Sequence, residues 1–309
     1  MLRVRQQVAC PEMDEVAGSP VCIAFLDTGI ASMHPDFFYN QIVFRDFVNG
    51  MDAAYDDAGH GTHVCGIAAG SGRLSGGRYR GIAPGSRILM AKVLDKNGDG
   101  TAENMLQGME WIFQNQTRYQ IRIVNISIGI GILKDPEKEK ELRQYVDEAW
   151  HQGLVVVCAA GNTGPEIATI SALGKSRNVI TVGCHDGEYY KGSGKRCELY
   201  SGRGPADRII KKPDLVAPGT EIISCNAAFR AGNRRSNAPA YVQKSGTSMA
   251  TPMVSGAAAL LLQKWPEMSQ ETVKKRLLYA ATDLKEPWTK QGFGMLNIKR
   301  ALQQPEIIQ

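Results

Sequence analysis

Short apolar runs rich in β-branched residues alternate with longer amphipathic stretches along most of the chain. The short runs predict buried strands and the longer stretches predict helices, an alternation typical of βαβ units around a parallel sheet. The pattern therefore predicts an α/β fold with a central, mostly parallel sheet. The expected strands are 21–26, 88–94, 121–127, 154–159 and 179–182.

Two amphipathic helices are expected between these strands, at 102–115 and 137–151. The second has clear boundary signals, because Asp135 can cap it, Pro136 suits a first helical position and Gly153 follows its end.

Two further helices are expected near the carboxyl terminus. The segment 248–262 is rich in Ala, Met and Leu, which predicts a buried helix that crosses the core. Another helix is expected to begin after Ser269 and to run through Tyr279.

The chain shows no internal repeat and no Pro-rich linker that would divide it. Segments 70–81, 184–213 and 226–245 are rich in Gly, Ser and charged residues, which predicts surface loops. We therefore expect one large domain over 20–309, preceded by a short extension at 1–19.

Composition and charge exclude some classes of partner. The 309 residues are 43% hydrophobic, and the 36 Lys and Arg exceed the 31 Asp and Glu by five without forming a basic block. An excess this small and dispersed favours neither nucleic acid nor a membrane as a partner. No stretch approaches the length of an apolar membrane span either.

Three segments with chemically active residues stand out: Leu26 to Ile30 (LDTGI), His60 to Val64 (HGTHV) and Gly246 to Pro252 (GTSMATP). Each has an ordinary interpretation taken alone: a turn after a strand, a structural histidine, and a helix cap. The first also resembles an aspartic protease motif, but a single-chain enzyme of that class needs two copies and this chain has one.

The combination of the three segments favours nucleophilic catalysis. Amide hydrolysis needs a nucleophile, a base that takes its proton and an anion that orients the base. We expect Ser248, His63 and Asp27 to fill these roles. Asp27 and Asn162 also fall at or just past the ends of predicted strands, where a doubly wound sheet binds its ligands.

All three segments resemble the signature segments of the subtilisin-like serine proteases, the subtilase family, whose Asp, His, Ser order they share. The likeness extends from about residue 20 to residue 302, and it implies a three-layer subtilisin-like fold. It also implies a peptidase domain over 20–309 and a serine endopeptidase that forms an acyl-enzyme. Other segments that resemble the family are 127–129, 159–162, 200–205, 212–219 and 292–297.

The resemblance assigns further roles by position. The backbone N–H of Ser248, at the start of a helix, and the side-chain amide of Asn162 are expected to form the oxyanion hole.

A polypeptide substrate is expected to bind in extended form, by adding itself as a strand between two edges of the cleft. Ser171 falls where many relatives have Gly, which predicts a shallower main pocket. The expected substrate-binding residues are Ser127, Ile128, Gly129, Gly98, Gly100, Ala159, Ala160, Gly161 and Ser171.

No cofactor is expected for catalysis, and the sequence does not favour a structural calcium ion although it leaves one open. Residues 95–100 imitate the start of an EF-hand loop, but the twelfth position is Leu106 instead of Glu. Many relatives hold calcium in the loop after the histidine-bearing helix. Here that loop, 71–78, contains two arginines and no carboxylate or Asn.

A cytoplasmic location is expected, because the first twenty residues lack a secretory apolar core and seven cysteines is an odd number. The short 1–19 segment also resembles the intracellular branch of the family, which lacks a long prodomain. Cys184 and Cys197 bracket a Gly-rich loop and can bridge in an oxidising compartment, but two reduced thiols are favoured. The alternative is a mature secreted form.

Two other functions remain open at this point. One is a catalytically silent, peptide-binding regulator on the same fold, which a replaced triad residue would mark and which the intact triad does not favour. The other is a dedicated processing protease or an exopeptidase, for which 226–245 is the insertion large enough to block one end of the cleft.

Overall fold

A computed structural model describes residues 1–12, 14–128, 136–187, 192, 194–205, 211–232 and 237–303. Its main sheet has seven strands in the order β2-β3-β1-β4-β5-β6-β7, and every pairing between them is parallel. The strands are β1 (Cys22–Asp27), β2 (Ile42–Asp46), β3 (Arg87–Lys92), β4 (Ile121–Ile126), β5 (Val155–Ala159), β6 (Ile180–Cys184) and β7 (Leu215–Ala217).

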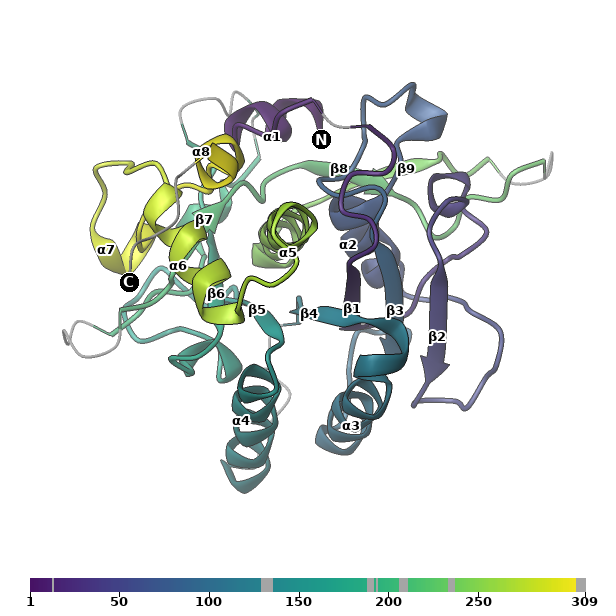
Figure 1. Cartoon of the computed structure of the whole chain (residues 1–309), viewed down its shortest axis with the longest axis horizontal. Helices are drawn as coiled ribbons and strands as arrows, with labels where there is room; N and C mark the ends of the chain where they lie inside the picture. Colours follow the sequence, from purple (N-terminus) through teal and green to yellow (C-terminus); the bar gives the residue numbers. More distant parts are fainter. Residues whose placement is uncertain are drawn as a thin grey trace.

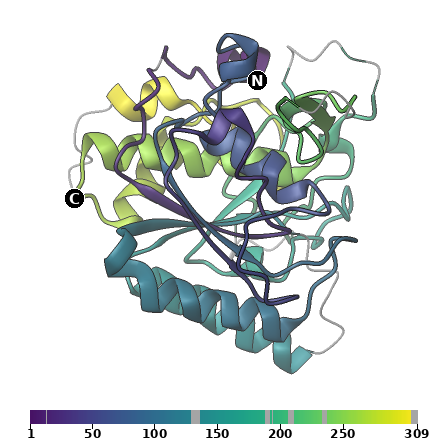
Figure 2. The ribbon, with the colours of Figure 1, turned by 90° about the vertical axis from the view of Figure 1, so that its right-hand side faces the viewer.

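Helices cover both faces of this sheet, as Figures 1 and 2 show. Helices α3 (Ala102–Tyr119) and α4 (Pro136–His151) lie below it in Figure 1, and α2 (His60–Ala69), α5 (Thr247–Lys264) and α6 (Gln270–Ala280) lie above it. This arrangement confirms the predicted three-layer α/β fold. The shorter helices are α1 (Leu2–Gln7), α7 (Trp288–Gln291), α8 (Ile298–Gln303) and the 3-10 turns η1 (Pro35–Phe37), η2 (Arg73–Ser75), η3 (Leu173–Lys175) and η4 (Cys197–Leu199).

The sheet separates two hydrophobic cores, which explains why its central strands read as continuous apolar runs. In β1, Ile23 and Phe25 belong to the core between the sheet and helices α2 and α5. Ala24 and Leu26 belong to the core between the sheet and helices α3 and α4. All four side chains are buried. A parallel strand covered by helices on both faces needs apolar residues at successive positions.

Helix α5 crosses the middle of the upper layer, where Figure 1 shows it almost end-on. Its residues 247–262 are all buried, so its small side chains reflect packing on every side. At Gly256 an added Cβ would lie 2.6 Å from the Cβ of Ile82. A larger residue there would push the helix away from the loop that precedes β3.

The predicted elements agree with the structure to within a few residues, and four strands were missed. These are β2, β7 and the antiparallel pair β8 (Ile222–Cys225) and β9 (Tyr241–Lys244). The prediction that 226–245 is entirely loop is therefore wrong at its end. The Ser269 cap of α6 is present, because its hydroxyl accepts from the N–H of Thr272. The predicted Asp135 cap lies outside the described residues.

The first residues of the chain pack against its last helix. Val4 and Val8 are buried, and the N–H of Ile298 donates to the carbonyl of Val8 at 2.8 Å. The expected division between residues 19 and 20 stays a prediction. No helix in the described part of the chain has both the length and the apolarity that crossing a bilayer requires.

Cys184 and Cys197 form a disulfide with their Cα atoms 5.7 Å apart, in contrast to the expected pair of reduced thiols. Cys184 at the end of β6 and Cys197 in the η4 turn are both buried in the core, so the fold places their two sulfur atoms next to each other. The free cysteines are Cys10, Cys22, Cys65, Cys158 and Cys225, and all except Cys10 are buried.

Candidate active site

Asp27 ends β1 at the carboxyl edge of the sheet, where the strand order reverses between β1 and β4. Its side chain is fully buried. Its Oδ1 accepts from the N–H of Thr28 at 2.8 Å and from Nδ1 of His60 at 2.7 Å. Because a carboxylate only accepts, the His60 proton lies on Nδ1 and Nε2 is left to exchange protons in the cleft.

Helix α2 begins with His60 and approaches β1 closely at Gly61. An added Cβ at Gly61 would collide with the carbonyl oxygen of Gly29 and would lie 3.1 Å from Oδ1 of Asp27. Glycine is therefore required after His60 for the imidazole to reach the aspartate.

Asp56 fixes the start of α2 against the end of β1. Its Oδ2 accepts from the N–H of Thr62 at 2.8 Å, which satisfies a free donor of the first turn. Its Oδ1 accepts from the hydroxyl of Thr28 at 2.8 Å, and that hydroxyl accepts from the N–H of Gly61 at 2.9 Å. One carboxylate thus ties together the two segments that carry Asp27 and His60.

His63, the base predicted from the sequence, faces away from the cleft, and that prediction is wrong. Its side chain is fully buried, and its Nε2 lies 3.0 Å from the carbonyl of Ile222 and 3.1 Å from that of Val242. It therefore pins the β8–β9 pair to α2. Two residues three positions apart point about 60° apart around a helix axis, and here only His60 meets Asp27.

The two histidines differ in proton affinity. Burial acts most strongly on His60 and lowers its pKa, but the charge and hydrogen bond of Asp27 outweigh burial and raise that pKa above the ordinary 6.5. Burial lowers the pKa of His63 to about 3, with help from the positive charges of Lys244 and His60. His63 is consequently neutral at ordinary pH, and its imidazole serves to hold the backbone of β8 and β9 against α2.

Ser248 occupies the first turn of α5 and shares a cavity with His60. This cavity of about 310 Å³ is also lined by Ser127, Ile128 and Gly98. The structure therefore brings the predicted nucleophile, the histidine bound to Asp27 and three of the predicted substrate-binding residues to one hollow at the sheet's carboxyl edge.

Asn162 lies beside the start of α5. Its Oδ1 accepts from the N–H of Thr247 at 3.0 Å and from the Thr247 hydroxyl at 3.1 Å. These bonds fix the orientation of the amide and leave its NH₂ group as the end that can donate to a ligand. This geometry suits the predicted oxyanion donor, whose role stays a prediction.

The other predicted substrate-binding residues that the structure describes are not among those that line this cavity. Gly129 lies outside the described residues. Gly100 forms a bridge with Leu94 on the loop that contains Gly98. Ser171 donates its hydroxyl to the carbonyl of Ala159 at 2.6 Å and its N–H to that of Ala160 at 2.8 Å. An added Cβ on Gly161 would lie 3.5 Å from the Cβ of Ser171, so these residues form one cluster beside β5.

Lys92 is a site residue that the sequence analysis missed. Its side chain is fully buried, and Nζ donates to the carbonyls of Thr28 at 2.7 Å and Leu94 at 2.8 Å and to Oδ1 of Asp57 at 2.7 Å. It holds the two loops that flank the cavity. A lysine within the apolar run 88–94 was the signal that could have revealed it.

Asn125 was missed for the same reason, as a polar residue in an apolar strand. Its Nδ2 donates to the hydroxyl of Ser127 at 2.7 Å, and its Oδ1 accepts from the hydroxyl of Ser255 at 2.8 Å. Asn125 thereby joins the predicted substrate edge to the helix that carries Ser248.

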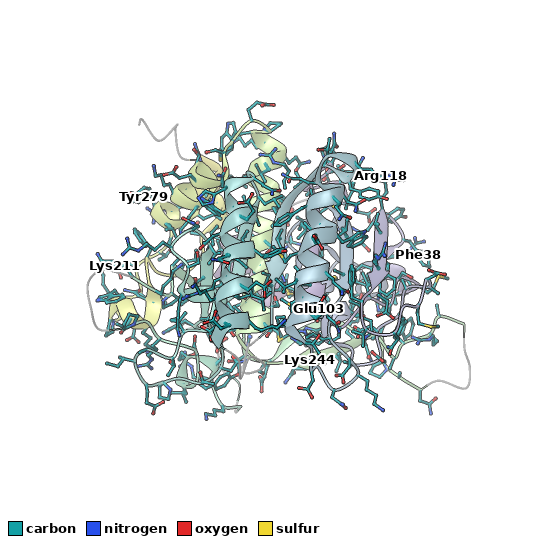
Figure 3. The ribbon with its side chains drawn as sticks, turned by 90° about the horizontal axis from the view of Figure 1, so that it is seen from below. Phe38, Glu103, Arg118, Lys211, Lys244 and Tyr279 are labelled. Atoms are coloured by element: carbon teal, nitrogen blue, oxygen red, sulfur yellow. A yellow bond between two sulfur atoms is a disulfide. The ribbon has the colours of Figure 1, made fainter. Side chains whose placement is uncertain are left out.

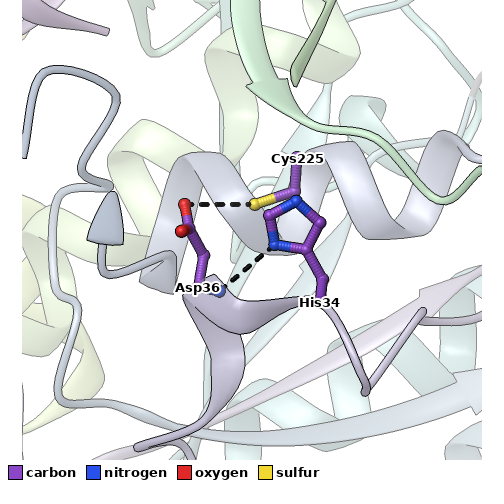
Figure 4. Close-up of side chains that lie close together, drawn as sticks. All are labelled: His34, Asp36 and Cys225. Atoms are coloured by element: carbon purple, nitrogen blue, oxygen red, sulfur yellow. Dashed lines mark hydrogen bonds between the residues drawn. The ribbon is translucent and has the colours of Figure 1, made fainter. Parts of the chain in front are cut away.

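A cluster of His34, Asp36 and Cys225 has the composition of a metal site, and Figure 4 shows its three side chains converging. Nδ1 of His34 accepts from the N–H of Asp36 at 3.2 Å, and Nε2 lies 2.8 Å from the carbonyl of Ala240. Burial raises the pKa of the Cys225 thiol well above its ordinary value. Both imidazole nitrogens are committed, and the Cys225 thiol lies 3.7 Å from Oδ2 of Asp36, so the donor atoms of this cluster are bound to one another and to the backbone and do not fit a metal ion.

The loop where many relatives hold calcium does not fit that ion either. Oxygen atoms of Asp36 accept from the N–H groups of Gly72 at 3.1 Å and Leu74 at 3.3 Å and from the hydroxyl of Tyr241 at 3.0 Å. Calcium sites need converging oxygen atoms, whereas this loop directs N–H donors at the carboxylate. Arg73 adds a positive charge on the same loop.

The sequence profile of the subtilase family of peptidases, S8, matches residues 18–295. The chain belongs to the subtilase family. This confirms the family that the sequence segments resembled.

Several relatives support the assignment. Serine protease AprX of Bacillus subtilis is 42% identical over 87% of this chain, which spans 62% of the length of AprX. Subtilisin DY of Bacillus licheniformis is 35% identical, over 93% of this chain and 92% of that protein.

Solved structures of subtilases agree with the fold. Sphericase superposes with a TM-score of 0.78 at 26% identity, covering 95% of this chain and 96% of its own. A cold-adapted subtilisin-like serine proteinase gives a TM-score of 0.70 at 27% identity, covering 93% and 92%.

Proposed function

We propose that this subtilase is a serine endopeptidase in which Asp27, His60 and Ser248 form the catalytic triad. The observation that carries the proposal is the 2.7 Å hydrogen bond between Asp27 and His60 at a cavity that Ser248 also lines. Family membership supports the same reaction class.

The reaction follows from these positions. The Oγ of Ser248 attacks the carbonyl carbon of the scissile bond as its proton passes to Nε2 of His60, which gives a tetrahedral oxyanion. His60 then protonates the leaving amine, the C–N bond breaks and an ester on Ser248 remains. Water, deprotonated by His60, hydrolyses that ester and restores the serine. Asp27 keeps the Nδ1 proton in place and stabilises the imidazolium.

The oxyanion is stabilised at the start of α5. The backbone N–H of Ser248 lies in the first turn of that helix, where the helix dipole is positive. The amide of Asn162, held by Thr247, supplies the second donor.

The substrate lies in extended form between the Gly98 loop and the segment that follows β4. Lys92 supports the first of these walls through Leu94, and Asn125 supports the second through Ser127. Main-chain pairing of this kind accepts many sequences, so side-chain pockets decide the cleavage sites.

The test combines covalent labelling with hydrolysis. A sulfonyl fluoride should modify Ser248, and casein hydrolysis should disappear in Ser248→Ala while Ser245→Ala, an exposed neighbour, stays active. Labelling elsewhere, or undiminished hydrolysis by Ser248→Ala, contradicts the proposal. Absence of both labelling and hydrolysis in the intact chain indicates a silent peptide-binding regulator, and release of only terminal peptides indicates an exopeptidase.

The cellular setting stays a prediction. Buried free thiols such as Cys65 and Cys158 suit a reducing, cytoplasmic compartment, whereas the Cys184–Cys197 disulfide suits an oxidising one. Fractionation of the producing cells, with the redox state of Cys184 trapped by alkylation, decides between them.

A further inference from the structure

Two lysines line the cavity that contains His60 and Ser248. Lys96 comes from the loop that leads to Gly98, and Lys244 ends β9, four residues before Ser248. In Figure 3 Lys244 lies on the same side of the view as Glu103, in the first turn of α3. The two lysines therefore belong to different walls of one cleft.

The lining of this cavity carries positive charge and no carboxylate. Its ionisable residues are Lys96, Lys244 and His60. Of the carboxylates nearby, Asp27 binds His60 and Asp57 binds Lys92, whereas Asp99, next to Gly98, is exposed to solvent. Among the described residues, none of these carboxylates forms an ion pair with Lys96 or Lys244.

The two lysines lack partners of their own. In the part of the chain that the structure describes, neither Lys96 nor Lys244 forms an ion pair or a side-chain hydrogen bond, although Lys244 is half-buried. Lys92 and Lys212, which are fully buried, each donate to a carboxylate and to backbone or side-chain oxygen atoms. A half-buried ammonium without a counter-ion gains from an anionic ligand.

We propose that the cleft selects polypeptides with an acidic side chain close to the scissile bond, and that Lys244 is the main determinant of this selectivity. The inference rests on the proposed endopeptidase function and names its substrate class. A peptide that reaches Ser248 past the Gly98 loop brings side chains beside both lysines. Glu or Asp there gains a charge-assisted hydrogen bond that Gln or Asn lacks.

The direct measurement compares matched peptides. Libraries that place Glu or Gln at each position around one cleavable bond should give a kcat/KM ratio of about 3 to 30 in favour of Glu at the selected position, the size of a partly desolvated ion pair. The ratio should fall as salt is added, because screening weakens attraction between charges that solvent reaches.

Single substitutions of the two lysines test which of them causes the preference for acidic peptides. Lys244→Gln should bring the ratio close to one at the selected position, and Lys244→Arg should restore it. Lys96→Gln should lower the ratio at a different substrate position, because it lies on the other wall. Lys275→Gln, on α6 and outside the cavity, removes the same charge and should leave the ratio as in the parent enzyme.

The outcomes separate this inference from the proposed function. Hydrolysis without an acidic preference, or a preference that survives Lys244→Gln, overturns the inference and leaves the endopeptidase intact. Failure to hydrolyse any peptide contradicts the function itself. Stoichiometric labelling by a sulfonyl fluoride in every variant shows that the site is still folded, so an altered ratio reports recognition.

Discussion

His60 and His63 lie three residues apart on α2 and have different surroundings: His60 meets a carboxylate at the cleft, and His63 meets two backbone carbonyls in the core. Proton transfer requires the first environment. The second requires only a neutral donor of the right shape, which explains why one short segment carries two histidines.

Substituting each histidine should therefore give opposite results. His60→Ala should lower kcat by about 10⁴- to 10⁶-fold, as removal of triad residues does in subtilisin, with little change in the free energy of unfolding. His63→Ala should lower the free energy of unfolding by about 1–3 kcal/mol and leave the folded enzyme active, since buried carbonyls lose their donor. Active-site titration with urea unfolding measures both, and loss of chemistry in a folded His63→Ala contradicts the assignment.

Asn162 should contribute to the rate and little to substrate binding. Asn162→Ala should lower kcat by about 10²- to 10³-fold with KM nearly unchanged, the cost of removing the corresponding donor in subtilisin. Its neighbour Thr163, which is exposed, provides the control as Thr163→Ala. A change confined to KM contradicts an oxyanion role.

The pKa of His60 predicts the pH profile of hydrolysis. The base must be neutral, so kcat/KM should rise with pH through a midpoint above 6.5, because Asp27 raises the pKa of His60. The negative charge of Asp56 acts in the same direction, whereas the positive charge of Lys244 lowers this pKa. Lys244→Gln should thus move the midpoint to higher pH, and a downward shift contradicts the charge arrangement.

Some site residues could be predicted from the sequence and others could not. The placement of Asp27, Ser248 and Asn162, whose roles stay predictions, followed from the sequence, because they lie at the end of a strand, at the start of a helix and just past a strand. The histidine that bonds Asp27 could not be chosen, because a motif shows that a helix turn is present but not which of its sides meets the aspartate. Lys92 and Asn125 appeared only as polar interruptions of apolar runs.

At the scale of elements, α2 depends on Asp56, which lies outside the helix yet satisfies its first turn. Asp56→Ala should lower the free energy of unfolding by about 1–2 kcal/mol, the cost of losing a helix cap. It should also lower kcat, because His60 is the first residue of that helix. Asp52→Ala, an exposed carboxylate on the same loop, is the control, and equal effects of both changes contradict this role.

The long strands and helices could be predicted because their apolar periodicity extends over whole turns or runs. The β8–β9 pair could not: the pattern of β9 (Tyr241–Lys244) is mostly half-exposed, and no short turn joins it to β8. Its position is set by His63 and by α2, which are distant in sequence. Strands held by such contacts carry little local signal.

At the scale of the whole molecule, the loop at 71–78 should contribute no calcium-dependent stability. The loop where relatives bind the ion is closed by N–H donors onto Asp36, so the folded state has no oxygen-lined site there. The melting temperature should be the same in chelator and in excess calcium, since a ligand stabilises only the state that binds it. A rise with calcium that Asp36→Asn abolishes contradicts this.

The bond chain from Ser127 through Asn125 to Ser255 has a practical consequence for engineering. It joins the proposed substrate wall to the helix that carries Ser248, so replacing that wall with the one from a relative would leave a buried amide or hydroxyl without its partner. Designs that introduce the cleavage specificity of a relative should therefore replace residues 125, 127 and 255 together.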